Sequence, residues 1–207
     1  MKKIILVGCG GHAKSVTDAI ESAGEYQIIG FIGVPEERAF SYRGYKSVGT
    51  DRDLERIFGE GTTYAFVCVG FIGEGVVRNK LYGRLKEIGY NIPVIKDPTA
   101  AIASDARIGE GAFIGKNAVV NSCADVGNMA IINTSSVVEH DCVVGEFSHV
   151  SVGAVLCGAV NVGENTFIGA NSTVIQGLTV ASNAIVGAGS TVLRDVMYSE
   201  RAVGVVK

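Results

Sequence analysis

Two acids flank one of the three histidines of this chain, in the sequence Glu139-His140-Asp141. A carboxylate beside an imidazole fixes its tautomer and makes it a stronger base. The triplet therefore predicts a general base at His140. A solvated turn with an incidental histidine is the alternative interpretation of the same residues.

A second candidate site is the glycine-rich loop Gly8-Cys9-Gly10-Gly11-His12-Ala13, which lies between an apolar run and a helical pattern. The N–H groups of such a loop, at the N-terminus of a helix, bind phosphate. The second apolar run ends at Val34 without the acid that binds ribose in dinucleotide domains. We therefore expect the diphosphate of a nucleotide sugar here rather than NAD; a merely tight turn is the alternative.

Strands and helices alternate in residues 1–97, which predicts a small parallel, Rossmann-like α/β sheet with right-handed crossovers. Asp97-Pro98 is the expected joint, so the predicted domains are 1–97 and 98–207. The expected strands are 4–7, 27–32, 64–69 and 92–95, and the expected helices are 14–23, 51–58 with a cap at Thr50 or Asp51, and 76–88.

The second half is a repeat of six residues that starts at Ile102. All sixteen first positions are aliphatic, the fifth is nearly always small, and glycine recurs at the second. A period of six suits a short strand and a corner, repeated on the three faces of a prism, with glycine expected to allow the bends. This pattern predicts a parallel β-helix, and the hexapeptide signature resembles the left-handed kind of bacterial acyltransferases.

Three faces of six residues make a coil of eighteen, which places Gly158 over His140 at about 5 Å. A backbone N–H presented by Gly158 would stabilise a thioester oxyanion. His149 lies half a coil away on another face, so we expect no pair with His140 within one subunit. The column carries no third histidine, which argues against a trimeric zinc enzyme of the gamma carbonic anhydrase type.

The composition excludes several other classes of protein. With 47% apolar and 19% charged residues, the chain is not disordered. A net charge of −3 argues against binding to nucleic acid or to an anionic membrane surface. No apolar run is long enough for a signal peptide or a membrane span, and five irregularly spaced cysteines fit a reducing compartment. We expect a cytoplasmic protein.

Residues 133–142 and 146–153 resemble the sialic acid O-acetyltransferase family of hexapeptide-repeat acyltransferases. Within that family the chain is most similar to the UDP-4-amino-sugar N-acetyltransferases of bacterial glycan pathways, such as bacillosamine synthesis. The stretches Gly10-Gly11-His12 and Val69-Gly70 match the N-terminal half. The resemblance covers nearly the whole chain.

The resemblance implies a homotrimer that binds acetyl-CoA between the β-helices of adjacent subunits. His140 would take the proton from the attacking amine of a nucleotide-linked amino sugar, with Asp141 as its partner. Direct transfer is implied, without a covalent enzyme intermediate or a metal. The remaining implied contacts are those of acetyl-CoA with His149, Ala170 and Ala188, and those of the sugar nucleotide with Gly10, Gly11, His12 and Gly70.

Three departures from the family pattern bear on the acceptor. Gly33-Val34 stands where relatives commonly carry two aspartates, Phe71-Ile72 replaces polar residues, and the C-terminal end lacks the usual Val-Pro pair. Acetylation of a hydroxyl group, on a sugar or on sialic acid, is the close alternative, since a histidine base serves either nucleophile. A non-catalytic β-helix scaffold with a nucleotide-sensing domain is the second alternative.

Overall fold

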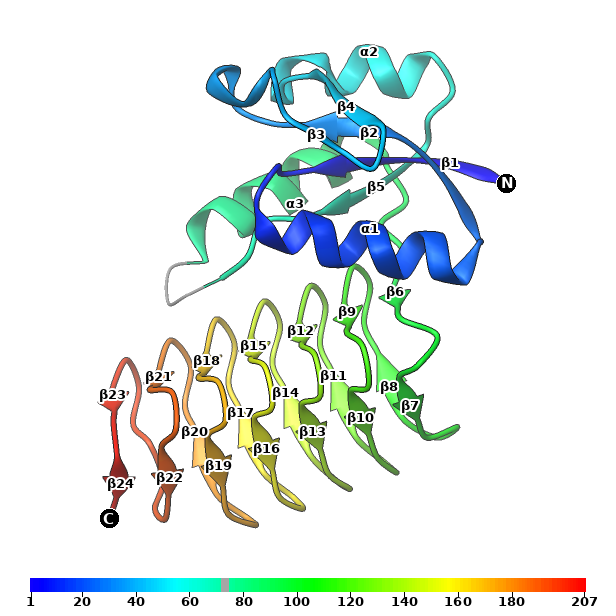
Figure 1. Ribbon diagram of the computed structural model, residues 1–207. Coiled ribbons are helices and arrows are strands. Elements are labelled where there is room, and N and C mark those ends of the chain that lie inside the picture. Colours follow the sequence, from blue (N-terminus) through cyan, green and yellow to red (C-terminus); the bar gives the residue numbers. More distant parts are fainter. Residues whose placement is uncertain (72–74) are drawn as a thin grey trace. The chain divides into compact units, whose positions relative to one another are not determined.

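A computed structural model describes residues 1–71 and 75–207, which fall into two compact units (Figure 1). The first unit holds Met1–Gly70 and Val76–Ile95. The second holds Lys96–Lys207 together with Phe71 and Gly75. None of the helices in the described ranges is both long and apolar enough to cross a membrane.

The first unit is an α/β domain built on a five-stranded sheet in the order β3-β4-β2-β1-β5. The sheet is parallel except for the antiparallel pair of β3 and β4. Its elements are β1 (Lys2–Val7), α1 (Gly11–Ala23), β2 (Tyr26–Ile32), the 3-10 turn η1 (Pro35–Glu37), β3 (Ser41–Tyr42), β4 (Tyr45–Gly49), the 3-10 turn η2 (Asp51–Asp53), α2 (Leu54–Gly59), β5 (Tyr64–Val67) and α3 (Val76–Ile88).

Local sequence explains the boundaries of the first helix. Strand β1 is buried from Ile4 to Val7, as its unbroken apolar run predicts. Helix α1 starts after Gly10, which offers no side-chain cap, and ends at Gly24, whose φ of 68° lies in the left-handed region. At this N-terminus Ala13 N donates to Gly10 O at 3.2 Å, which closes the first turn of α1.

The expected helices are all present, but the predicted strand 92–95 was wrong and one hairpin was missed. The hairpin of β3 and β4 was not predicted, because these short strands show little apolar alternation. Residues 92–95 do not form a strand of this sheet. Asn91 makes only an isolated bridge to Tyr64, and β6 (Ile95–Lys96) instead pairs with a strand of the second unit. The β-helix thus begins one repeat earlier than the predicted frame.

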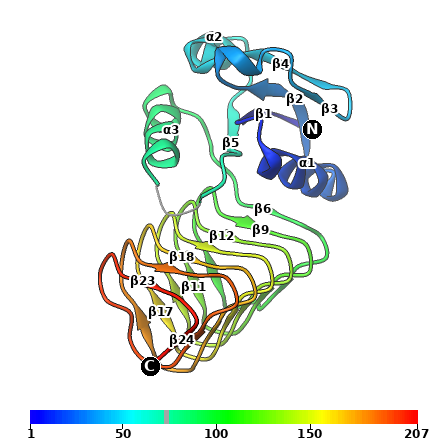
Figure 2. The ribbon, with the colours of Figure 1, turned by 60° about the vertical axis from the view of Figure 1, so that its left-hand side comes forward.

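The second unit is a left-handed parallel β-helix whose coils stack in three parallel sheets (Figure 2). As far as β22, strands pair with the one eighteen residues further on, as Val119 does with Val137 and Val137 with Val155. The last coil is shorter, because Ile185 pairs with Arg201 and Thr191 with Val205. The strands are β7 (Ala101–Ile102), β8 (Arg107–Ile108), β9 (Phe113–Ile114), β10 (Val119–Val120), β11 (Asp125–Val126), β12 (Ile131–Ile132), β13 (Val137–Val138), β14 (Val143–Val144), β15 (His149–Val150), β16 (Val155–Leu156), β17 (Asn161–Val162), β18 (Phe167–Ile168), β19 (Thr173–Val174), β20 (Thr179–Val180), β21 (Ile185–Val186), β22 (Thr191–Val192), β23 (Arg201–Ala202) and β24 (Val205–Val206).

The interior of the column holds the residues that the repeat predicts. First-position aliphatic residues from Ile114 to Val192 are buried, and most of the small fifth-position residues pack with them. Polar fifth-position residues bind carbonyl groups of the wall: Ser148 Oγ donates to Gly163 O at 2.7 Å and Thr166 Oγ1 to Ala181 O at 3.0 Å. These buried hydroxyl groups are therefore satisfied.

The glycines have a different role from the predicted one. A Cβ at Gly145 would lie 2.5 Å from Glu164 N in the next coil, so second-position glycine permits close stacking of coils. The bend itself lies at the fourth position, where φ is positive even for Phe147 (58°) and Asp141 (59°). At most corners the fourth-position residue, rather than the second-position glycine, turns the chain.

Candidate active site

His140 and Asp141 form a hydrogen-bonded pair on the corner between β13 and β14. His140 Nδ1 lies 2.8 Å from Asp141 Oδ2, and both side chains are 60% exposed. The left-handed φ of Asp141 turns its carboxylate back toward the preceding ring. An ionised carboxylate only accepts, so Nδ1 carries the proton and Nε2 is left as the basic nitrogen.

Hydrogen bonds from the coil below hold this corner in place. His140 N donates to Glu139 Oε2 at 3.1 Å, and the same oxygen accepts from Asn121 Nδ2 at 3.0 Å. Asp141 N donates to Ser122 O at 3.0 Å. The backbone of the triplet is thus fixed on a rigid element, which is what a positioned base requires.

The acidic surroundings of His140 favour its protonated form. The hydrogen bond to Asp141 is the main cause of a raised pKa for His140, and the charges of Asp141 and Glu139 add to it. A raised pKa makes the imidazole a stronger base once it is deprotonated. The ring is therefore suited to accept a proton from an incoming nucleophile.

Gly158 lies directly over the His140 ring, one coil later. A Cβ at position 158 would be 2.6 Å from both Cε1 and Nε2 of His140, so only glycine leaves room for the imidazole. Gly158 is also the only glycine at the third position among the sixteen repeats, a signal that the sequence itself carries. Among the hydrogen bonds of the described residues, none uses the Gly158 N–H as donor.

His149 is buried rather than presented to solvent, with 8% of its surface exposed. Its Nδ1 lies 2.8 Å from Phe71 O and its Nε2 lies 3.0 Å from Asn133 Nδ2. The Asn133 Oδ1 atom accepts from Thr134 N, so the amide donates to Nε2 and Nδ1 carries the proton. The ring also packs edge-on against Phe167, at 5.2 Å between centroids. The predicted contact of His149 with acetyl-CoA stays a prediction.

Ala170 and Ala188 stack on another corner, after β18 and β21. Gly189 N donates to Ala170 O at 2.8 Å, which ties the two coils together. Ala188 is exposed and Ala170 is partly exposed. This corner follows strands of the β6–β23 sheet, whereas His140 follows a strand of the β7–β24 sheet. The predicted acetyl-CoA residues and the predicted base therefore do not converge on one corner of one chain.

The predicted substrate residues of the first unit gather at the carboxyl ends of β1 and β5. Gly10 and Gly11 are exposed, and a Cβ at either would meet nothing within 4 Å. A Cβ at Gly70 would lie 3.9 Å from the Cβ of His12, so the loops after β1 and β5 adjoin. Open glycines at the N-terminus of α1 suit a phosphate. Of Phe71-Ile72, Phe71 is buried in the second unit and Ile72 lies outside the described residues.

Glu37 is a candidate site residue that the sequence analysis missed. A Cβ at Gly33 would lie 2.5 Å from Glu37 Oε2 and 2.7 Å from Cys9 Sγ. Burial, together with the Glu37 carboxylate, raises the pKa of the Cys9 thiol to about 11, so the thiol stays protonated. The end of β2 thus has an acid beside it, supplied by a residue four positions after Gly33.

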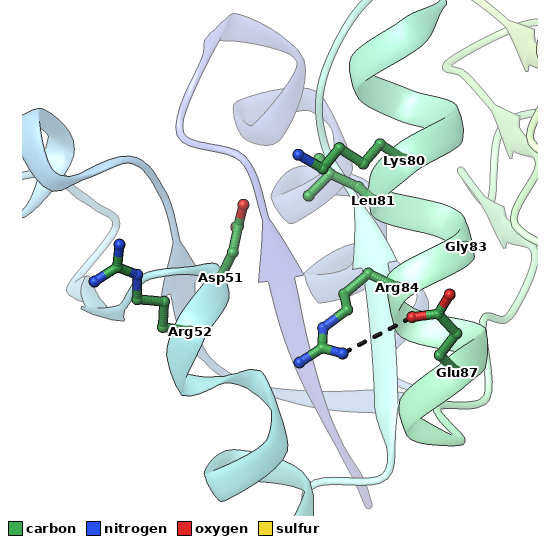
Figure 3. Close-up of a pocket in the computed structure, with 7 residues that line it drawn as sticks. All are labelled: Asp51, Arg52, Lys80, Leu81, Gly83, Arg84 and Glu87. Carbon is green, nitrogen blue, oxygen red and sulfur yellow. Dashed lines mark ion pairs between the residues drawn. The ribbon is translucent and has the colours of Figure 1, made fainter.

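A further cavity of about 530 Å³ lies between η2 and α3 in the first unit (Figure 3). Arg84 pairs there with Glu87 at 3.8 Å and with Glu55 at 2.7 Å. None of the predicted site residues lines this cavity. Across the described ranges, no group of three histidine, cysteine or acidic side chains is placed to hold a metal ion.

Comparisons with known proteins agree with this two-part architecture. The family model described as PglD N-terminal domain matches residues 3–85. The model described as hexapeptide repeat of succinyl-transferase matches residues 106–139 and 159–194. A search of curated proteins found no match.

Among solved structures, one similar protein is GDP-perosamine N-acetyl transferase from Caulobacter crescentus. A histidine-to-alanine mutant of it, in complex with CoA and GDP-perosamine, is 32% identical, with 99% of this chain and 94% of that chain covered and a TM-score of 0.92. The acetyltransferase domain of PglB from Neisseria gonorrhoeae is 29% identical over 96% of this chain and 95% of that one, with a TM-score of 0.88. WeeI from Acinetobacter baumannii shares the fold at 18% identity, with 95% and 93% covered and a TM-score of 0.71.

Proposed function

The chain belongs to the hexapeptide-repeat sugar N-acetyltransferases, and we propose that it moves an acetyl group from acetyl-CoA to the amino group of a nucleotide-linked amino sugar. The observation that carries the proposal is the His140–Asp141 pair, 2.8 Å apart, with its ring seated over Gly158. The predicted acceptor is a UDP-4-amino-4,6-dideoxy sugar. The relative from Caulobacter crescentus was solved with GDP-perosamine, so both nucleotides belong in the test.

The proposed reaction is a direct transfer with His140 as base. His140 Nε2 accepts a proton from the amine while the amine nitrogen bonds to the thioester carbon. The Gly158 N–H donates to the oxygen that becomes negative, in the manner of an oxyanion hole. Asp141 holds the ring through Nδ1 and stabilises the imidazolium. The carbon–sulfur bond then breaks, and the imidazolium returns its proton to the leaving CoA thiolate.

The two substrates are assigned to different parts of the chain. Gly10, Gly11, His12 and Gly70 receive the nucleotide sugar, with the diphosphate at the N-terminus of α1. The contacts proposed for acetyl-CoA are with Ala170, Ala188 and His149. Because the Ala170 corner and the His140 corner differ within one chain, a site that uses both draws them from two subunits. This arrangement supports the predicted homotrimer.

The test is the release of thiol from acetyl-CoA, followed with a colour reagent. The acceptor panel contains UDP-, dTDP- and GDP-linked 3-amino and 4-amino sugars, together with sialic acid. One amino sugar should give release, and His140→Ala should lower kcat about 10²- to 10⁴-fold because the base is lost. Glu164→Ala is the matched control, since Glu164 is an exposed third-position residue on another corner.

Each outcome decides between the candidate functions. Near-normal turnover of His140→Ala would remove the base assignment. Release with sialic acid or a hydroxyl acceptor alone would replace N-acetylation by O-acetylation. A protein that neither binds acetyl-CoA nor releases thiol would be a scaffold rather than an enzyme.

A further inference from the structure

The space beside Gly33 is taken by the carboxylate of Glu37. A Cβ at Gly33 would lie 2.5 Å from Glu37 Oε2 and 3.1 Å from the Glu37 Cβ, and its φ is not in the left-handed region. Glycine stands here to admit a side chain, not to relieve the backbone. The Glu37 carboxylate therefore lies where an acidic residue at the end of β2 would place its own carboxylate.

This carboxylate is next to the glycine-rich loop. Gly8 N donates to Ile32 O at 2.7 Å, so the ends of β1 and β2 are joined just before the loop and before Gly33. A Cβ at Gly33 would also lie 2.7 Å from Cys9 Sγ, so Cys9 and Glu37 approach the same space beside Gly33. Glu37 therefore stands at one flank of the proposed diphosphate site.

In doubly wound domains that bind nucleotides, the first loop and helix hold the phosphates, and an acid beside the end of the second strand binds a ribose hydroxyl. We propose that Glu37 fills this second role and accepts hydrogen bonds from the ribose hydroxyl groups of the nucleotide sugar. The inference rests on the proposed function, because it identifies how that acceptor is bound.

The carboxylate keeps capacity for such bonds. Glu37 Oε2 accepts from Val34 N at 3.2 Å, and the Cys9 thiol also forms a hydrogen bond with this carboxylate. A carboxylate has about four acceptor positions, so a ribose diol can still be bound.

A cavity for the base adjoins the same glycine. Its volume is about 290 Å³, and its lining includes Gly33, Pro35, Arg38, Thr50 and Arg52. This volume is near the lower end for small-molecule sites and suits one base rather than a dinucleotide. The two guanidinium groups are planar and can stack on a base.

The competing interpretation is that Glu37 only caps η1 through Val34. The test compares the binding of UDP and GDP with that of their 2′,3′-dideoxy forms, by calorimetry without acetyl-CoA. The wild type should bind the ribose forms about 10- to 100-fold more tightly, as expected for hydrogen bonds to a charged group. Glu37→Ala should abolish that preference, while Glu36→Ala, which removes a neighbouring carboxylate, should keep it.

Gly33→Ala provides a second variant that retains the carboxylate. Its Cβ must displace Glu37 Oε2, so it should also reduce the ribose preference, and it remains informative if Glu37→Ala does not fold. A preference that survives in both variants overturns the inference, as does equal weakening of ribose and dideoxy forms. Nucleotide binding without any ribose preference in the wild type overturns the inference and leaves the proposed function standing. Absence of nucleoside diphosphate binding overturns the nucleotide-sugar assignment as well.

Discussion

The β-helix and the α/β unit position their candidate residues in different ways. In the β-helix, a period of eighteen residues places Gly158 over His140, so one number relates the two positions. In the α/β unit, Glu37 reaches the space beside Gly33 through the 3-10 turn η1, and Asp53 reaches the space beside Gly49 through η2, but no repeat length relates the two turns. A repeating backbone allows side-chain contacts to be predicted from the sequence, whereas turns without a repeat length do not.

The glycines of the two units show the same contrast. Most second-position glycines of the β-helix share one reason, the approach of the next coil, as at Gly145 and Gly169. In the α/β unit each glycine has its own surroundings: Gly33 faces a carboxylate, Gly30 faces Lys46 O, and Gly83 faces nothing within 4 Å. The effect on stability or activity of replacing a glycine should therefore depend on its repeat position in the β-helix and on its individual neighbours in the α/β unit.

Gly158→Ala is the change with the largest expected effect on this comparison. The added methyl group must displace the His140 ring, and a misplacement of about 1 Å can cost about 10²-fold in rate. Ala170 and Ala188 occupy the same repeat position, so the backbone accepts alanine. We expect kcat to fall about 10²-fold at an unchanged melting temperature, measured by thiol release and thermal unfolding. An unchanged kcat would mean that register does not define the site.

Asp141→Asn should have a smaller effect, below about 10²-fold on kcat, because it alters the base without removing it. Asparagine tolerates the left-handed φ of 59° at this corner. Asp141 raises the pKa of His140, so the variant histidine should lose its proton at lower pH. Since the base acts when deprotonated, the acidic limb of the kcat/KM profile should move to lower pH. A shift to higher pH would contradict the assigned hydrogen bond.

Gly83→Ala tests the other unit and should have the smallest effect. Gly83 lies inside α3 with open space around it, so alanine should stabilise the helix by about 0.5–1 kcal/mol. Urea unfolding measures the gain, and acetyl transfer should not change. A loss of activity would instead connect the cavity of Figure 3 with function.

The sequence predicted most of the fold and the central pair of the candidate site. The aliphatic first positions and small fifth positions are sufficient to define the β-helix, and the Glu139–Asp141 triplet marks the corner that the structure builds. The glycine over His140 was found from register alone. These features depend only on local spacing and on one repeat length.

The remainder depended on contacts between residues without a common period. The antiparallel β3 and β4 are short, and the two-residue turn at Arg43-Gly44 that joins them was not recognised. His149 contacts the Phe71 carbonyl and the Phe167 ring, and no local spacing indicates the contact with Phe71, which is distant in sequence. The acid beside β2 was sought at the strand end, whereas Glu37 approaches the strand end from a position four residues after Gly33.

The corner geometry also bears on how such columns change length over evolutionary time. The His140 base depends on three neighbouring levels of the stack, its own and those of Asn121 and Gly158, since each coil touches only its neighbours. Duplication or deletion of a whole coil elsewhere would leave the pair in register. Insertion of a coil between His140 and Gly158 would separate the two residues by one further coil. The height of the column can thus change in other coils, whereas the coils from Asn121 to Gly158 must stay contiguous.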